Sequence, residues 1–279
     1  MEGKTEGKID FQNMPAYVIN LDRRTDRWET FSKQELIGYF HGIERISATD
    51  GKYLDVENDT RISLHTRDNI RNNMRRSHYE INTPGACGAS FSHIACWKKF
   101  LETEEEYCLI IEDDCMLRKD DFAKAVVYSK NVPSEFDIWI LGMHNGSLVS
   151  VDYAPGSPWS KIGRFTGAHC YILTRKAAQL LLKECFPIET HIEFYMCATV
   201  KTNNMLMISH KNLRVPQLVE TTYNNDSDTV AEQTCPLCKI PTNPSNIWVL
   251  VPISSLLHAG IAMAAVGFVT YGYFKKMRC

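Results

Sequence analysis

A short apolar run that ends in three acids constrains the fold of this chain more than any other feature. Residues 107–111 read YCLII and pass directly into Glu112, Asp113 and Asp114. A run of this length is typical of a strand that is buried on both faces. Such strands occur in sheets covered by helices, where ligands bind beyond the carboxyl ends of the strands. We therefore expect the three acids to line a ligand-binding crevice. The alternative is a solvated turn that caps the next helix.

Strand and helix patterns alternate along most of the chain. The predicted strands are residues 16–21, 43–48, 107–111, 136–141 and 169–173, and the predicted helices are 26–37, 88–101, 121–130 and 175–185. This alternation predicts an α/β fold with a mostly parallel sheet flanked by helices. Between the patterns, residues 52–82 are polar and irregular. We interpret their arginines, Arg61 to Arg76, as part of a solvated loop, with a lid over an anionic donor or a patch facing anionic lipid as alternatives.

The charge balance and the missing motifs exclude several classes of function. The 31 basic and 33 acidic side chains give a formal net charge of −2, which does not suit a strongly basic nucleic-acid binder, so we expect no nucleic-acid partner. The sequence has no GxxxxGK phosphate loop, no GxGxxG after its first strand and no HExxH zinc motif. It also lacks the GxSxG elbow of α/β-hydrolases, which weakens a hydrolase interpretation of the Ser92–His93 pair.

A second apolar segment lies near the carboxyl end of the sequence. Residues 247–274 contain no Asp, Glu, Lys or Arg, and the basic residues Lys275, Lys276 and Arg278 follow. Because about 20 apolar residues cross a bilayer as a helix, this segment predicts a single-pass C-terminal membrane anchor. The polar first ten residues do not resemble a signal peptide, which favours a cytosolic catalytic domain. The basic tail favours the opposite side, so the orientation stays open.

The ten cysteines do not form the spacing of a disulfide scaffold. Several lie inside apolar segments, where a free cysteine behaves as a small hydrophobic residue. Cys235 and Cys238 form a single CxxC in a polar stretch, and a zinc site would need a second pair of ligands.

Five segments in series resemble one known family. They read VINLDRRTDRW at 18–28, GACGASFSHIACWKKF at 85–100, CLIIEDDC at 108–115, FDIWILG at 136–142 and GAHCYILTRKAAQLLL at 167–182. Together they resemble glycosyltransferase family 25 over residues 15–217. The resemblance implies a GT-A-like domain and inverting transfer of a hexose, galactose favoured, from a UDP-sugar to a hydroxyl of a glycan or protein acceptor. The alternative is a catalytically degenerate transferase fold that acts as a membrane-tethered binding or scaffold protein.

The resemblance also places residues of the donor site. Asn20, Arg24 and Arg27 would lie against the nucleotide, since arginine suits a diphosphate. Three adjacent acids need compensation, and a hard divalent cation such as Mn²⁺ or Mg²⁺ provides it. Asp114 is the expected metal ligand, and Glu112 or Asp113 would hold the metal or the donor ribose.

The general base and a further metal ligand are less closely defined. Glu189 stands where relatives commonly carry an aspartate, and Glu193, which we expect one helical turn away, is the alternative base. Both acids also fit the amino end of a helix. His210 is a candidate additional metal ligand, while His93 is either a ligand or a structural hydrogen-bonding residue.

These patterns divide the chain into five parts. We expect an N-terminal tail at 1–14, a catalytic domain at 15–218, a polar tether at 219–246, a transmembrane helix at 247–274 and a basic tail at 275–279.

Overall fold

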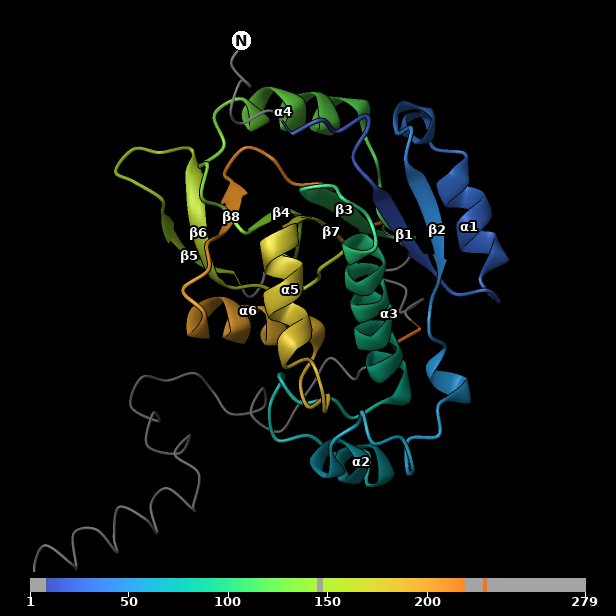
Figure 1. Ribbon diagram of the computed structural model, residues 1–279. Coiled ribbons are helices and arrows are strands. Elements are labelled where there is room, and N and C mark those ends of the chain that lie inside the picture. The colour runs from blue at the N-terminus through green and yellow to red at the C-terminus, as the bar shows by residue number, and fades with distance from the viewer. Residues whose placement is uncertain (1–8, 145–147, 219–227, 230–279) are drawn as a thin grey trace, which may run out of the picture. The chain divides into compact units, whose positions relative to one another are not determined.

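The computed structural model of the chain describes residues 9–144, 148–218 and 228–229 (Figure 1). All of these residues belong to one compact unit, Met1–Glu232. The predicted membrane segment 247–274 and the Cys235–Cys238 pair lie outside the described residues. Among the helices that are described, none combines the length and the apolar character needed to cross a bilayer.

One mixed sheet organises the described part of the chain. Its eight strands lie in the order β2-β1-β3-β7-β4-β8-β6-β5. Their bounds are β1 Ala16–Asn20, β2 Ile43–Ser47, β3 Tyr107–Glu112, β4 Ile138–Gly142, β5 Val149–Asp152, β6 Trp159–Arg164, β7 Cys170–Thr174 and β8 Met207–His210. β1 pairs in parallel with both β2 and β3, and β4 pairs in parallel with β8. The remaining four pairings are antiparallel.

The prediction of an α/β fold is confirmed, but the prediction of a mostly parallel sheet is wrong. It assumed a helical crossover between successive strands. After β4, however, the chain forms the antiparallel hairpin β5–β6 and then returns through β7, with no helix among the described residues of this stretch. β7 therefore runs against both of its neighbours, β3 and β4. Without a helical crossover, the chain reverses direction instead of repeating it.

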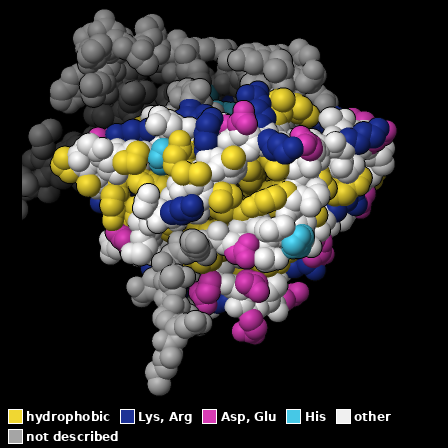
Figure 2. All heavy atoms as spheres, turned by 90° about the horizontal axis from the view of Figure 1, so that it is seen from above, with side chains coloured by type: hydrophobic (Ala, Val, Ile, Leu, Met, Phe, Trp, Pro, Cys, Tyr) yellow, Lys and Arg dark blue, Asp and Glu magenta, His cyan; other side chains and the backbone are white. Residues whose placement is uncertain are grey.

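Helices cover both faces of this sheet (Figure 1). The bounds are α1 Thr25–Ser32, α2 Leu64–Arg71, α3 Pro84–Leu101, α4 Lys119–Ser129, α5 Arg175–Lys183 and α6 Ile192–Thr202, with 3₁₀ turns η1 Glu35–Tyr39 and η2 Gly51–Tyr53. Residues of α3, α5 and α6 pack into the core on one face, and residues of α1 and α4 pack into the core on the other. Seen from above in Figure 2, the surface intersperses basic and acidic side chains, in keeping with the near-neutral net charge.

The central strands are apolar on both faces. In β3, Ile110 belongs to the core under α3, while Leu109 and Ile111 belong to the core under α4. This confirms the doubly buried strand expected from the YCLII run. The cysteines in the described ranges are all unpaired, and six of the seven are buried, as expected for small hydrophobic side chains.

The domain begins earlier in the chain than predicted. Ile9, Phe11 and Met14, which we placed in the N-terminal tail, are buried in the core under α4. The ring of Phe11 contacts Phe122 and Trp139 edge to face, with ring centroids 6.3 and 6.0 Å apart. Residues 9–14 thus cover an apolar surface of the domain that would be exposed if the domain began at residue 15.

Helix α3 begins at Pro84, four residues before the predicted start. Thr83 is its N-cap, and the Thr83 hydroxyl accepts a hydrogen bond from the backbone N–H of Ala86 at 3.3 Å. Proline suits the first helical position because its missing N–H has no partner there anyway. The early start matters for the site, since the first turn of α3 carries Gly85 to its edge.

The arginine-rich stretch is more ordered than predicted. It contains α2, and its guanidinium groups are held locally. Arg67 donates to the carbonyl oxygens of Ile62, Glu57 and Asp59, and Arg71 and Arg76 pair with nearby acids. These interactions fix the stretch as a structured part of the domain.

Candidate active site

The carboxyl ends of β1, β2 and β3 meet at one edge of the sheet and open into a cavity of about 120 Å³. The first half of α3 forms another wall, with Ser92 and His93 on its lining face. Glu112, Asp113 and Asp114 line the cavity, as expected for acids that follow a parallel strand. The predicted crevice therefore forms where the sequence placed it.

Asp113 is the structural centre of the acidic motif. Its Oδ2 accepts a hydrogen bond of 2.6 Å from the side-chain amide of Asn20, and its Oδ1 accepts one of 3.0 Å from Arg27. Burial raises the pKa of this carboxyl above its ordinary value, although Asn20 and Arg27 act in the opposite direction. The amide of Asn20 is fixed in turn, because its oxygen accepts from Nε of Arg45 at 2.7 Å. The structure thus joins the ends of β1 and β3 through one buried network.

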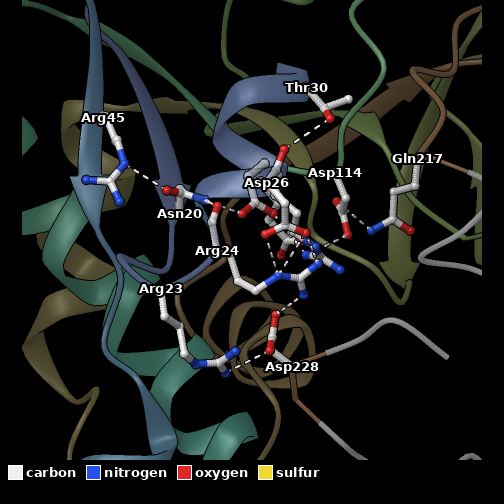
Figure 3. Close-up of polar contacts among 12 residues, drawn as sticks. Asn20, Arg23, Arg24, Asp26, Thr30, Arg45, Asp114, Gln217 and Asp228 are labelled. Carbon is white, nitrogen blue, oxygen red and sulfur yellow. Dashed lines mark hydrogen bonds and ion pairs between the residues drawn. The ribbon is translucent and has the colours of Figure 1, made fainter. Parts of the chain in front are cut away.

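Asp114 is the least compensated of the acids. Burial, followed by the charge of Glu112, raises the pKa of Asp114 to about 7. Its Oδ1 accepts a hydrogen bond of 3.2 Å from Gln217 (Figure 3), while Nη1 of Arg27 lies 3.8 Å from its Oδ2. Gln217 also contacts Nε2 of His144 through its amide oxygen. A buried carboxylate with so little compensation favours a cation nearby.

Glu112 is held by a chain of hydrogen bonds from α3. Nε2 of His93 lies 3.2 Å from Oε1 of Glu112, and Nδ1 of His93 lies 3.0 Å from the hydroxyl of Tyr171. The indole N–H of Trp97 donates to the same hydroxyl at 2.9 Å. Burial acts to raise the pKa of Glu112, but the hydrogen bond and charge of His93 bring it below its ordinary value. His93 is therefore a positioning residue for an ionised acid, which resolves its two predicted roles.

The three arginines of the first motif diverge. Arg27 points into the cavity and pairs with Asp113, with 11% of its side chain exposed. Arg24 pairs with Asp26 and with Asp228, and Arg23 also contacts Asp228 (Figure 3). Asp228 lines the same cavity. Arg27, Glu112, Asp113 and Asp114 thus line the cavity, while Asn20 and Arg24 contact residues that line it. The role of these six residues in donor binding stays a prediction.

The two candidate bases lie in different places. Glu193 is in the first turn of α6, and its Oε1 accepts from the backbone N–H of Gly167 at 3.1 Å. Gly167 lies directly beside the ring of His144, which reaches Asp114 through Gln217. Glu189 is exposed and lines a separate cavity of about 210 Å³. It precedes α6, so the expected helical turn between the two acids is absent.

His210 is not brought to the acidic motif. Its ring stacks on Tyr128 of α4, with centroids 3.6 Å apart, and meets Trp159 edge to face at 4.9 Å. The residue lies at the end of β8, and it is buried among aromatic rings. Desolvation lowers its pKa, as expected for a neutral, buried imidazole.

The residues at this edge fit a divalent cation only with help from a substrate. Within the described ranges, no three His, Cys, Asp or Glu side chains are grouped to hold a metal ion. Mg²⁺ and Mn²⁺, however, commonly bind through one or two carboxylates and complete their coordination with water and phosphate oxygens. Asp114 and Glu112 supply such a pair of carboxylates, and burial, followed by the charge of Glu112, raises the pKa of Asp114.

Three residues of the site had no signal in the sequence. Gln217, Tyr171 and Asp228 act through contacts with residues 103, 78 and 204 positions away. Each belongs to a segment whose local pattern indicates only a strand or a polar stretch. Covarying residues in an alignment are the kind of signal that reveals such pairs.

Comparison with known proteins identifies one family. Residues 13–150 match the model of glycosyltransferase family 25, described as an LPS biosynthesis protein. A glycosyltransferase 25 family member from Anopheles gambiae is 25% identical over 174 residues, which are 60% of this chain and 28% of that protein. The chain therefore matches well under a third of that relative's length.

Solved structures give weaker similarities. The inositol-1-phosphate CTP transferase from T. maritima has a TM-score of 0.43 at 12% identity, covering 82% of this chain and 100% of that chain. UDP-glucose pyrophosphorylase complexed with UDP-glucose has a TM-score of 0.38 at 12% identity, covering 72% of this chain and 91% of that chain.

Proposed function

Because residues 13–150 match the model of glycosyltransferase family 25, the family that the sequence motifs predicted, we propose that the protein is a metal-dependent hexosyltransferase of the GT-A type. It moves a hexose, galactose favoured, from a UDP-sugar to a hydroxyl of a glycan or protein acceptor, with inversion at the anomeric carbon. The identity of donor and acceptor is part of this proposal, since the chain matches only 28% of the relative's length.

One observation carries the proposal. Asp114 is buried at the end of β3 with a pKa raised to about 7, in a cavity that it shares with Arg27 and Glu112. Keeping an undercompensated acid in such a place costs free energy, and active sites are where this cost is commonly found. A cation would compensate the acids Asp114 and Glu112, and a diphosphate would pair with Arg27.

The residues of the chain suggest a division of work. Arg27 holds Asp113 in place, and a guanidinium group at this position in the cavity is suited to phosphate oxygens. Asn20 locks the end of β1 to the same acid. His93 keeps Glu112 oriented toward the cavity, because its other ring nitrogen is fixed by Tyr171. The donor would then meet a preorganised set of charges.

Asp114 and Glu112 would hold the divalent cation, with Asp113 as their hydrogen-bonded support. When bound, Mn²⁺ or Mg²⁺ supplies positive charge that stabilises the departing nucleoside diphosphate.

The acceptor hydroxyl needs a base on the opposite face of the sugar. We favour Glu193 over Glu189, because Glu193 is bonded to Gly167 beside His144, whereas Glu189 lines a different cavity. Glu193 can accept the hydroxyl proton as the new glycosidic bond forms and the bond to the diphosphate breaks.

We also propose that residues 247–274 anchor the enzyme in a membrane through the polar stretch at 219–246. The proposal rests on the charge-free composition of the segment alone. Expression with a fluorescent tag, followed by carbonate extraction of membranes, would test it: release of the full chain into the soluble fraction contradicts an integral anchor.

Donor turnover tests the proposed reaction. The full chain is incubated with a panel of UDP-sugars and Mn²⁺, and released UDP is measured with and without EDTA. We expect hydrolysis or transfer with one hexose donor, and loss of turnover in EDTA. Asp114→Asn should lower turnover by about 100-fold or more, since it removes a proposed ligand of the cation that stabilises the departing diphosphate.

Asp120→Asn is the matched control. Asp120 is an exposed acid in the first turn of α4, six positions along the chain, and its variant should keep wild-type turnover. Equal activity of wild type and Asp114→Asn would contradict the proposed role of the acidic motif. Tight UDP binding without turnover of any donor would instead favour the degenerate transferase fold.

A further inference from the structure

Asp228 lies between two arginines at the cavity. Its Oδ1 is 2.7 Å from Nη2 of Arg23, and its Oδ2 is 2.7 Å from Nη1 of Arg24 (Figure 3). One carboxylate therefore divides its two oxygens between two guanidinium groups. The side chain of Asp228 is only 21% exposed, and that of Arg24 is 13% exposed. The contact is more sheltered than an ordinary surface ion pair.

Both arginines are fixed from their other sides. Nε of Arg23 donates to Asp50 at 2.6 Å. Nε and Nη2 of Arg24 donate to Asp26 at 3.0 and 2.8 Å. These anchors hold each guanidinium so that a remaining N–H edge faces Asp228. Such an arrangement is preorganised for an anion with at least two oxygens.

The backbone around Asp228 is seated on the first turn of α3. The hydroxyl of Thr83 donates to the carbonyl oxygen of Thr229 at 2.6 Å. A Cβ atom at Gly85 would lie 2.3 Å from the carbonyl oxygen of Asp228, so a side chain there would push the segment away. Residues 228–229 therefore pack closely against α3, and this packing requires the absence of a side chain at Gly85.

The same cavity thus contains two kinds of charge. Glu112 and Asp114 form its acidic side, while Asp228 marks the place where arginines gather. A carboxylate and a phosphate present similar pairs of oxygens to arginine, but a diphosphate carries more charge and more acceptors.

We propose that Arg23 and Arg24 form a phosphate-binding subsite and that Asp228 is its internal competitor. The inference rests on the proposed function for the identity of the natural ligand, a nucleoside diphosphate sugar. The diphosphate binds the two arginines when Asp228 leaves them. The measured affinity for the ligand is then reduced by the fraction of molecules in which Asp228 occupies the subsite.

Inorganic pyrophosphate is the probe, because its binding needs neither a sugar nor turnover. Its affinity for the full chain is measured by isothermal titration calorimetry in EDTA, for wild type, Asp228→Asn and Asp228→Ser. We expect both variants to bind pyrophosphate about five- to tenfold more tightly, since each removes the competing carboxylate. Arg24→Gln in the Asp228→Asn background should abolish the gain.

Asp120→Asn is the matched control, because it removes the same charge at an exposed position in the first turn of α4, outside the lining of the cavity. It should change the pyrophosphate affinity by less than about twofold, as expected for a screened charge away from the subsite. A gain equal to that of Asp228→Asn would reduce the effect to net charge and overturn the proposal. Unchanged affinity in both Asp228 variants, with a lower melting temperature, would make Asp228 a structural tie and would also overturn it.

The outcome is separable from that of the proposed function. Tighter pyrophosphate binding in the Asp228 variants, with no turnover of any UDP-sugar, would support the phosphate subsite and reject the transferase reaction. Metal-dependent turnover combined with unchanged pyrophosphate affinity would support the reaction and reject the competitor.

Discussion

His93 is the hydrogen-bond donor and Glu112 the acceptor across the 3.2 Å contact that joins α3 to the end of β3. An ionised carboxylate can only accept, so Nε2 of the histidine carries the hydrogen. In the neutral ring, Nδ1 then accepts from the hydroxyl of Tyr171, whose oxygen accepts in turn from Trp97. The tautomer of His93 is therefore set by two aromatic residues of the core.

Tyr171→Phe should test this chain of hydrogen bonds. The variant leaves the buried indole N–H of Trp97 without its acceptor and His93 without its donor. We expect the free energy of unfolding to fall by about 1–3 kcal/mol, which is the usual cost of an unsatisfied buried group. Urea unfolding measures it, and turnover should fall as well because Glu112 loses its orientation. Tyr53→Phe, at a tyrosine that is 77% exposed, is the control and should leave the free energy of unfolding unchanged. Equal stability of the two variants would contradict a contribution of this hydrogen-bond chain to stability.

Gln217→Leu should weaken the binding of the metal ion without unfolding the protein. Gln217 donates to Oδ1 of Asp114, and outer partners of this kind alter metal affinity by about 10- to 100-fold. We expect the Mn²⁺ concentration for half-maximal turnover to rise by about tenfold, with a smaller change in the maximal rate. Gln12→Leu, at a surface glutamine that contacts His41, should leave the metal titration unchanged. An identical titration for Gln217→Leu would show that Asp114 needs no orientation from this amide.

Gly88→Ala should destabilise the fold. A Cβ atom at Gly88 would lie 2.4 Å from the carbonyl oxygen of Thr49, a backbone atom that cannot move alone. Forcing one methyl group into such a contact costs about 1–3 kcal/mol. Gly38→Ala is the control, because nothing lies within 4 Å of its Cβ position. Thermal unfolding should separate the two variants, and a stable Gly88→Ala would show that the loop before η2 can shift.

Stability should fall in mild acid because of His191. Burial lowers the pKa of this histidine below its ordinary value of 6.5, despite the opposing charge of Glu193. Above pH 6.5 both folded and unfolded chains hold it neutral, so its penalty is absent. As the pH falls below 6.5 the unfolded chain binds the proton first, and stability is lost at up to about 1.4 kcal/mol per pH unit. Urea unfolding between pH 7.5 and 5 should show a shallower slope for His191→Asn; parallel curves would exclude His191 as the cause.

The sequence was sufficient to locate the acidic cavity because the polar residues around it follow two neighbouring parallel strands. Asn20 ends β1, and Glu112 to Asp114 follow β3, so parallel pairing brings them to the same edge. Both strands are apolar on both faces, and this pattern is local and easily recognised. The family motifs lie in the same segments.

The remaining features depend on contacts that leave no local pattern. Strand β7 was predicted as a strand, but its antiparallel direction is set by the β5–β6 hairpin before it. Gln217 contacts Asp114, and Asp228 lines the cavity, but both belong to polar stretches of sequence that follow β8. Glu189 and Glu193 were expected one helical turn apart, but α6 begins only at Ile192, so Glu189 lies outside the helix.

The position of β7 has a consequence for any shortened version of this protein. In the described sheet, β2-β1-β3 and β4-β8-β6-β5 share no hydrogen-bonded ladder except through β7, which pairs with β3 on one side and β4 on the other. The family match ends at residue 150, twenty positions before β7 begins at Cys170. In a fragment that ends at residue 150, the edges of β3 and β4 that normally pair with β7 would be exposed to solvent and to the strand edges of other fragment molecules. The segment that matches the family model is therefore shorter than the segment needed to complete the sheet.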